Sequence, residues 1–320
     1  MRTLIVGAGA TGGYLGVQLL RAGRHVTFLV RPKTLSRIVS NGIQVRSGGV
    51  DTAVDVNAIT TANLEGSYDA VILAVRSDAV ASTIDDVRPA VGSGTKIMPV
   101  TNGMAHLDIM VAAFGEDVVV GAAAKLATSL LADGTIDEVA RGVQLEMGAL
   151  DGKPSAELDS LATEFGVDGI SVTVSAAIRT AMWEKFAFIA STAVLTCLSG
   201  DVIGAVARAE GGISLARRVL DEVAAVAAAE GHPIADSTIA TLTGVLTDSS
   251  SQFAPSMFRD LHAGRPVETS VFADLATRAR QHDISTPLLD ASIVAINVRQ
   301  QARAGAAIRR SCAVTAGSGP

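Results

Sequence analysis

Cysteine and aromatic residues are both scarce in this chain. It has two cysteines, Cys197 and Cys312, and aromatic residues make up only 3% of its 320 positions. Neither cysteine belongs to a CxxC pair or to a spacing typical of metal ligands. We therefore expect two reduced thiols, no bound metal and a cytoplasmic protein.

Long hydrophobic segments and blocks of basic residues are lacking as well. The most apolar stretch, Ala181 to Leu198, contains Glu184 and Lys185, which argues against a membrane span. The apolar run after Thr3 is short and ends in glycines, which favours a strand over a signal peptide. The formal net charge of -6 makes nucleic acid and anionic membranes poor partners, so we expect a small-molecule ligand.

Apolar residues are plentiful, at 48%, and the length suits two domains of roughly 150 residues each. The pattern changes near residues 170–178 from mixed strands and helices to helices alone. We therefore predict a first domain at 1–174 and a second at 175–306. Residues 307–320 end in SCAVTAGSGP, which has no periodicity, and we expect this tail to be disordered.

The first domain alternates short apolar runs with helical segments. Apolar runs without polar alternation are typical of strands that helices cover on both faces. The pattern predicts an α/β fold, with a doubly wound parallel sheet of the Rossmann type. The predicted strands are 3–8, 25–30, 70–75 and 96–101, with helices at 13–22 and 78–90; tight turns link later strands at 118–131, 135–140 and 143–148.

The second domain is predicted to be all α-helical. Its alanine-rich helices fit a buried core and the interface of a homodimer equally well, so the oligomeric state stays open. The predicted helices are 178–198, 213–230, 267–282 and 288–304.

A glycine-rich motif directly follows the first predicted strand and directly precedes a helix. It reads Gly7, Ala8, Gly9, Ala10, Thr11, Gly12, a GxGxxG pattern. In this context the first glycine allows a tight turn, the second lets the backbone approach a pyrophosphate, and the third permits close helix–strand packing. We predict a dinucleotide-binding loop made by Gly7, Gly9, Ala10, Thr11 and Gly12; the alternative is a glycine turn without a ligand.

The end of the second predicted strand indicates which dinucleotide binds. An NAD site usually has a carboxylate there, which binds the ribose 2′-hydroxyl. Here the sequence has Arg31 and Lys33 and no carboxylate between positions 29 and 33. A guanidinium suits a 2′-phosphate, which favours NADPH; the alternative is that Arg31 is an ordinary surface arginine.

Lys185 is one of only five lysines and lies in a mostly apolar helical segment. At helical spacing it adjoins Ala181, Met182 and Ile189. Partial desolvation lowers the pKa of a lysine and makes it a better proton donor near neutral pH. From the residues alone, a lysine that extends to the surface and pairs with a carboxylate is an equally good interpretation.

These features together resemble the ketopantoate reductase family (2-dehydropantoate 2-reductases) over residues 1–303. The motifs that carry the resemblance are, in chain order, GAGATGGYLG at 7–16, Arg31, Asn102–Met104, Trp183–Lys185, Ser256–Asp260 and Arg265–Glu268.

The resemblance implies roles for individual residues. Lys185 matches the lysine that protonates the ketone oxygen, and Glu268 and Ser256 match the acid and hydroxyl of the substrate pocket. Asn102 matches the asparagine that bridges cofactor and substrate, and Arg76 stands where a lysine near the cofactor is common. The family's cofactor is NADPH and its reaction belongs to pantothenate biosynthesis. Without the resemblance, Asn102 is better interpreted as a turn residue and Glu268 as a solvated carboxylate.

The chain also departs from the family pattern. Asparagines are usual four and eight residues after the lysine, where this chain has Ile189 and Ala193. An Asn-Gly pair is usual five and six residues after the glutamate, where it has Ala273 and Asp274. We therefore predict an NADPH-dependent reductase of a 2-oxo acid in which ketopantoate itself is in doubt. The alternatives are a related NAD(P)-dependent hydroxy-acid dehydrogenase with a less polar substrate, and a non-catalytic NADPH-binding sensor.

Overall fold

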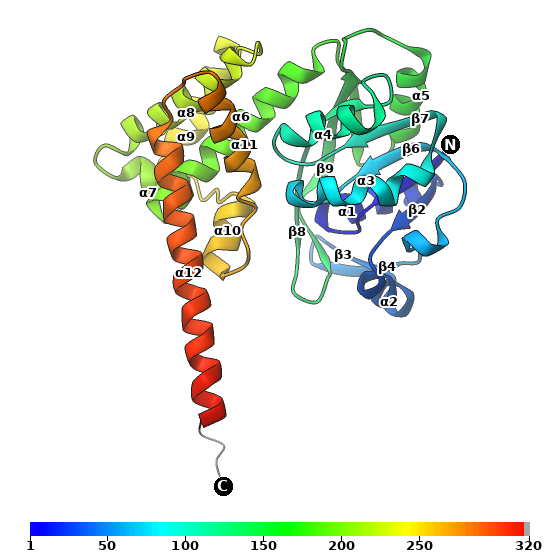
Figure 1. Cartoon of the computed structure of the whole chain (residues 1–320), viewed down its shortest axis with the longest axis horizontal. Helices are drawn as coiled ribbons and strands as arrows, with labels where there is room; N and C mark the ends of the chain where they lie inside the picture. Colours follow the sequence, from blue (N-terminus) through cyan, green and yellow to red (C-terminus); the bar gives the residue numbers. More distant parts are fainter. Residues whose placement is uncertain (317–320) are drawn as a thin grey trace. The chain divides into compact units, whose positions relative to one another are not determined.

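The chain divides into two compact units, with the division in the sequence between Lys185 and Phe186. The computed structural model describes residues 1–316, and describes side chains through residue 303. The last strand, β10 (Ile170–Val174), ends at the predicted domain boundary, and the following helix, α6 (Ile178–Ser199), begins in the first unit and ends in the second. In Figure 1 the first unit runs from blue to green and the second from green to red.

A five-stranded parallel sheet forms the centre of the first unit. In spatial order its strands are β5 (Asn57–Ile59), β2 (His25–Leu29), β1 (Arg2–Val6), β6 (Tyr68–Leu73) and β7 (Val91–Pro99). All neighbours in this order pair in parallel. The strand order reverses at β1, which is the arrangement of a Rossmann-type sheet and confirms the predicted fold class.

Both faces of this sheet are buried, as the unbroken apolar runs predicted. Ile5 and Phe28 share one hydrophobic core with Leu15 of helix α1 (Ala10–Arg21). Leu4 and Val71 alternate with such residues, so they point to the opposite face, and both have no exposed surface. The other helices of this unit are α2 (Pro32–Asn41), α3 (Val80–Val87), α4 (Ala105–Phe114) and α5 (Ala156–Phe165), with short 3-10 helices at Thr61–Asn63, Ser77–Ala79 and Arg88–Ala90.

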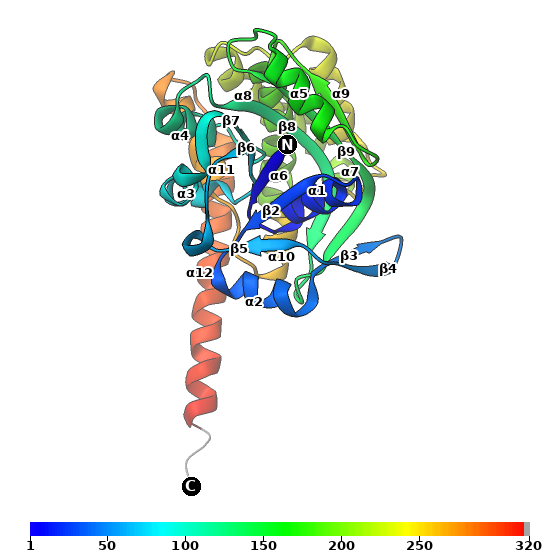
Figure 2. The same cartoon turned by 90° about the vertical axis from the view of Figure 1, so that its right-hand side faces the viewer.

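Helix α1 also contacts a second sheet, which the sequence did not predict. This sheet has the order β10–β9–β3–β4, with β8 paired to β9, and contains β3 (Ile43–Ser47), β4 (Val50–Val54), β8 (Val120–Leu130) and β9 (Ile136–Ala149). The hairpin β3–β4, visible in Figure 2, turns through Gly48 and Gly49, whose φ angles are 56° and 82°. Two adjacent residues with positive φ are what a tight hairpin turn needs, so the Gly-Gly pair was a usable signal.

The structure corrects the strands predicted at 135–140 and 143–148. They form the single strand β9, which pairs with β8 along its whole length. The pairing shifts register between Leu126 and Thr128, and Gly142 opposite has a φ of 91°. A bulge therefore carries the strand through the point where the sequence suggested a turn.

The second unit is all helical, as predicted. Besides the end of α6 it contains α7 (Ile203–Arg208), α8 (Gly212–Ala229), α9 (Asp236–Thr247), α10 (Ser256–Ala263), α11 (Ser270–Gln281) and α12 (Pro287–Ala316). Helices α7, α9 and α10 were not predicted. Helix α12 extends to Ala316, into the tail expected to be disordered, and residues 317–320 of that tail lie outside the described residues.

Helix α6 is long and apolar enough to cross a membrane by those two measures alone. However, 67% of its most apolar window is buried inside the structure, as in the core helix of a globular protein. Cys197 on this helix is fully buried, and burial raises the pKa of its thiol to about 12, so it stays protonated at neutral pH.

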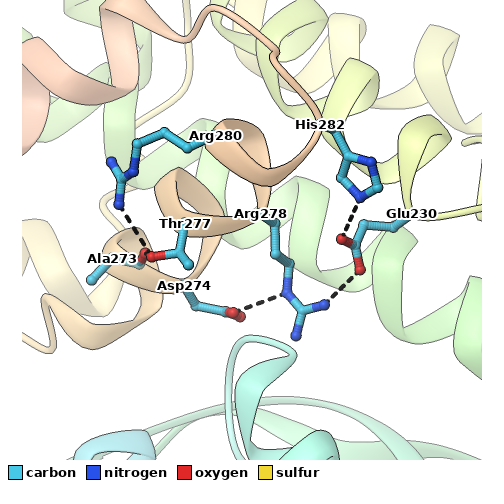
Figure 3. Close-up of polar contacts among 7 residues, drawn as sticks. All are labelled: Glu230, Ala273, Asp274, Thr277, Arg278, Arg280 and His282. Carbon is cyan, nitrogen blue, oxygen red and sulfur yellow. Dashed lines mark hydrogen bonds and ion pairs between the residues drawn. The ribbon is translucent and has the colours of Figure 1, made fainter.

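A chain of ion pairs joins α8 to α11 (Figure 3). Arg278 donates from Nη1 to Oε2 of Glu230 at 2.5 Å and from Nε to Oδ1 of Asp274 at 2.9 Å. Glu230 also lies 2.9 Å from Nε2 of His282. Burial by itself raises the pKa of Glu230, but hydrogen bonds from His282 and Arg278, together with their charges, outweigh it and hold this pKa below its ordinary value of 4.5.

We expect Glu230→Gln to lower the free energy of unfolding by about 1.5–3 kcal/mol at pH 7, because a half-buried guanidinium loses a charged acceptor. The folded carboxyl keeps its charge to lower pH than the unfolded one, so its stabilisation is present above pH 4.5 and fades as the pH falls below that value. Urea denaturation at pH 7 and pH 3.5 measures both effects. Asp221→Asn, at an exposed acid of α8, is the control. An equal loss of unfolding free energy in both variants would contradict a stabilising role for the ion pair of Glu230 with Arg278.

Candidate functional site

The residues predicted to bind the cofactor gather at one edge of the parallel sheet. Val6 pairs with Leu29 on one side and with Leu73 on the other, and Leu73 pairs with Pro99. The strands β2, β1, β6 and β7 therefore end side by side. The loops that follow them carry, in the same order, Arg31, the glycine motif, Arg76 and Asn102. In open α/β sheets this carboxyl edge is where ligands bind.

The three glycines of the motif meet different local requirements. Gly7 has a φ of 97°, and a Cβ there would lie 2.9 Å from the carbonyl oxygen of Ala74. A Cβ on Gly12 would overlap the carbonyl oxygen of Gly7 and lie 2.7 Å from Cβ of Ala74. A Cβ on Gly9 would meet no protein atom within 4 Å. The fold itself thus requires glycine at positions 7 and 12, whereas at Gly9 the open space fits the close approach of a ligand.

The glycine loop delivers the start of α1 to this open space. Gly9 is the N-cap residue, and no side chain caps the helix there. The first turn, which includes Ala10, Thr11 and Gly12, contains no acidic residue. The first N–H groups of a helix have no acceptor within it, and they carry the positive end of the helix dipole. These donors fit the pyrophosphate of a dinucleotide.

Arg31 is exposed and is the N-cap residue of α2. Its position at the end of β2 is fixed because Val30 donates its N–H to the carbonyl oxygen of Ile59 at 2.9 Å. The first turn of α2 has no acidic residue, and Lys33 beside it is exposed. This end of β2 therefore has a positive charge and suits a phosphate better than a ribose hydroxyl.

Arg76 precedes the short helix Ser77–Ala79 and forms an ion pair with Asp78. Nη2 of Arg76 lies 3.1 Å from Oδ2 of Asp78, and both side chains are about half exposed. The carboxylate offsets part of the charge that Arg76 could present to an anion. Arg31, in contrast, forms no ion pair with any side chain described in the structure.

Asn102 lies between β7 and α4 and is half-buried. Gly103 follows it with a φ of 88°, so the chain turns sharply there. The hydroxyl of Thr101 donates to the carbonyl oxygen of Val75 at 3.3 Å, which holds the loops after β7 and β6 together. Asn102 and Arg76 are therefore placed on neighbouring, linked loops.

Lys185 is half-buried on α6, between the buried residues Trp183 and Phe186. Ile189 and Ala193 follow it at one and two helical turns on the same face. Ala193 has no exposed surface and Ile189 is half-buried. The helix face that carries Lys185 is therefore apolar where the family pattern has asparagines.

The remaining predicted residues belong to two other elements of the helical unit. Ser256 is exposed and begins α10, while Glu268 is half-buried in the segment before α11. The carbonyl oxygen of Glu268 accepts the N–H of Val271 at 3.4 Å, so this residue is attached to the first turn of α11.

An aromatic pair in the helical unit escaped the sequence analysis. Phe188 of α6 and Phe253, in the loop before α10, have ring centroids 5.5 Å apart at an angle of 48°. Phe253 is 38% exposed. The scarcity of aromatic residues was the only sequence signal, and it did not distinguish this pair from core residues.

Family comparisons agree with this arrangement. The family model described as ketopantoate reductase PanE/ApbA matches residues 3–152, and the model of its C-terminal region matches residues 177–300. The chain belongs to this family. It is an oxidoreductase family, and the Rossmann-type sheet and helical second unit are the fold of its solved members.

Individual relatives show how far the likeness extends. An uncharacterised oxidoreductase of Bacillus subtilis is 28% identical, over 91% of this chain and 96% of the relative. A 2-dehydropantoate 2-reductase of Mesorhizobium japonicum is 26% identical, over 92% and 97%. The solved ketopantoate reductase of Ralstonia eutropha is 25% identical with a TM-score of 0.83, covering 94% of this chain and 99% of that one. D-mandelate dehydrogenase, solved with NADH and anilino(oxo)acetate, has a TM-score of 0.85 at 18% identity over the same shares.

Proposed function

We propose that this protein is an NADPH-dependent reductase that converts a 2-oxo acid with a less polar side chain than ketopantoate into the 2-hydroxy acid. The observation that carries the proposal is the open space at Gly9, next to the start of α1. The neighbouring strand β2 ends beside this loop and is followed by Arg31. An expected cytoplasmic location and a small-molecule substrate belong to the same proposal. A homodimer stays open, although a structurally similar ketopantoate reductase of Staphylococcus aureus is described as dimeric.

The residues of the first unit would bind the cofactor. The N–H groups of Ala10, Thr11 and Gly12 bind the pyrophosphate, and Arg31 binds the 2′-phosphate. Arg76, on the loop after β6, supports the adenosine end of the cofactor. Asn102, on the loop after β7, orients the nicotinamide end. The bound nicotinamide supplies the hydride for the carbonyl carbon.

The remaining residues act on the substrate. Lys185 donates a proton from Nζ to the carbonyl oxygen, and its charge stabilises the negative charge that develops there. Glu268 and Ser256 bind and orient polar groups of the substrate. Partial burial of Lys185 supports this role because a less hydrated ammonium interacts more strongly with the negative charge that develops on the oxygen.

The departures on α6 support a less polar substrate. Amides at positions 189 and 193 would offer hydrogen bonds, whereas Ile189 and Ala193 offer none. A substrate hydroxyl beside them would be desolvated without a partner, which costs about 1–3 kcal/mol. D-mandelate dehydrogenase, which has the same fold, was solved with the aryl compound anilino(oxo)acetate.

A panel of 2-oxo acids tests the proposal through NADPH oxidation at 340 nm. We expect 3,3-dimethyl-2-oxobutanoate, which is ketopantoate without its terminal hydroxyl, to be reduced with at least the same kcat/KM. A tenfold or larger preference for ketopantoate would contradict the argument from Ile189 and Ala193. Tight NADPH binding without turnover of any 2-oxo acid would instead favour a non-catalytic sensor. This is the second candidate function because Ile189 and Ala193 stand where the family has substrate-binding asparagines. If NADP oxidised the 2-hydroxy acids faster than NADPH reduced the 2-oxo acids, the protein would be a hydroxy-acid dehydrogenase.

A further inference from the structure

Phe253 is unusual among the aromatic side chains of this protein. The chain has only eight phenylalanines, two tyrosines and one tryptophan. Within the described residues, Phe253 is the one aromatic side chain among the exposed large hydrophobic residues. The ring is 38% exposed, so it offers apolar surface that the apolar part of a ligand would cover favourably.

The position of Phe253 is well defined by hydrogen bonds. Its N–H donates to Oγ of Ser251 at 3.2 Å, and its carbonyl oxygen accepts the N–H of Ile203 at 3.3 Å. Gly204 donates to the carbonyl oxygen of Ser251 at 2.9 Å, so two residues at the start of α7 hold this loop. The ring is therefore presented by a fixed backbone.

The ring of Phe253 contacts α6 next to the proposed proton donor. Its partner Phe188 follows Lys185 by three residues, and Ile189 follows Lys185 by four. Residues three and four apart are neighbours on a helix surface. Phe188 and Ile189 therefore adjoin Lys185 on α6, and the ring of Phe253 packs against Phe188. Ser256 lies only three residues after Phe253.

We propose that Phe253 is a specificity-determining residue that packs against the side chain of the 2-oxo acid, and that this side chain is aromatic. An aryl group would cover the exposed part of the Phe253 ring and pack against Ile189 without leaving a polar group unpaired. The inference rests on the proposed function, because the reacting carbonyl has to lie at Lys185.

Kinetics of Phe253→Ala with phenylglyoxylate and pyruvate test the proposal. We expect the parent protein to prefer phenylglyoxylate at least tenfold in kcat/KM. The variant should lose about tenfold with phenylglyoxylate and less than twofold with pyruvate, because pyruvate has only a methyl group to pack. Phe253→Leu should recover part of the loss. Ile213→Ala, at another exposed apolar residue of the same unit, should change neither value.

Binding measurements separate this inference from the proposed function. With NADPH present, calorimetry should show anilino(oxo)acetate binding at least tenfold more tightly than oxamate, its small analogue, and Phe253→Ala should remove the difference. If this preference is found but no 2-oxo acid is reduced, the proposed function fails and the role of Phe253 stands. If the parent shows no preference for the aryl ligand, or if the variant loses affinity for both ligands equally, the role of Phe253 is wrong.

Discussion

Replacing Lys185 by alanine is expected to lower kcat by about 10²–10⁴-fold, the usual effect of removing a general acid. Hydride arrival places negative charge on the carbonyl oxygen, and the variant has no ammonium there to stabilise it or to donate a proton. The loss should fall mainly on kcat, because the proton moves in the transition state, and KM should rise less. Lys185→Arg should not restore activity, since a guanidinium stays protonated at working pH.

Steady-state kinetics with the best acid of the panel measure this effect, after a thermal melt has confirmed folding. Lys153→Ala is the matched control, because Lys153 is 82% exposed and its ion pair is with Asp151, two residues away in the sequence. The affinity for NADPH should stay close to that of the parent, because the glycine loop and Arg31 are unchanged. A kcat within about threefold of the parent would show that Lys185 is not the acid.

Replacing Arg31 by alanine is expected to weaken NADPH binding by roughly tenfold to a hundredfold and to leave NADH binding almost unchanged. A charge-assisted hydrogen bond to the 2′-phosphate contributes about 1.5–3 kcal/mol, and NADH has no such phosphate. Arg31 is exposed, so its removal should not affect folding. Fluorescence titration of the reduced cofactors measures both affinities.

Gly9→Ala provides the contrasting variant. Its Cβ would meet no protein atom within 4 Å, so the fold should keep its thermal stability. The methyl group would occupy space that both cofactors need for their pyrophosphate, so NADPH and NADH should be weakened alike. If Arg31→Ala also weakened the two cofactors equally, Arg31 would not be the residue that recognises the 2′-phosphate.

The sequence by itself determined four strands of the parallel sheet and the position of its glycine loop, but not the three-residue strand β5. Both depend on local signals, since a short apolar run between helices has few alternatives and Gly7 and Gly12 must accommodate a turn within one βα unit. The absence of a carboxylate directly after β2 was also a signal that could be recognised within a few consecutive residues. The all-helical second unit followed from periodicity. The short helices α7 and α10 did not, because six and eight residues carry too little pattern, and α9 was missed although it has twelve residues.

Only the tertiary structure decided features that join residues distant in the sequence. The second sheet pairs Val45 with Ile136, and no local pattern specifies such a partner. The space at Gly9 differs from the crowding at Gly12 partly because Ala74, which directly follows β6, lies beside only one of them.

The helical unit shows the same division between local and distant information. Asp274 precedes Arg278 by four residues on the same helix, which is the usual spacing for an ion pair. The ion pair between Arg278 and Glu230, in contrast, joins two helices. Phe253 lies beside α6 because α7 anchors its loop. Packing between separate elements decides each of these contacts. A single sequence specifies which residues are present, but it does not show which of them pack together.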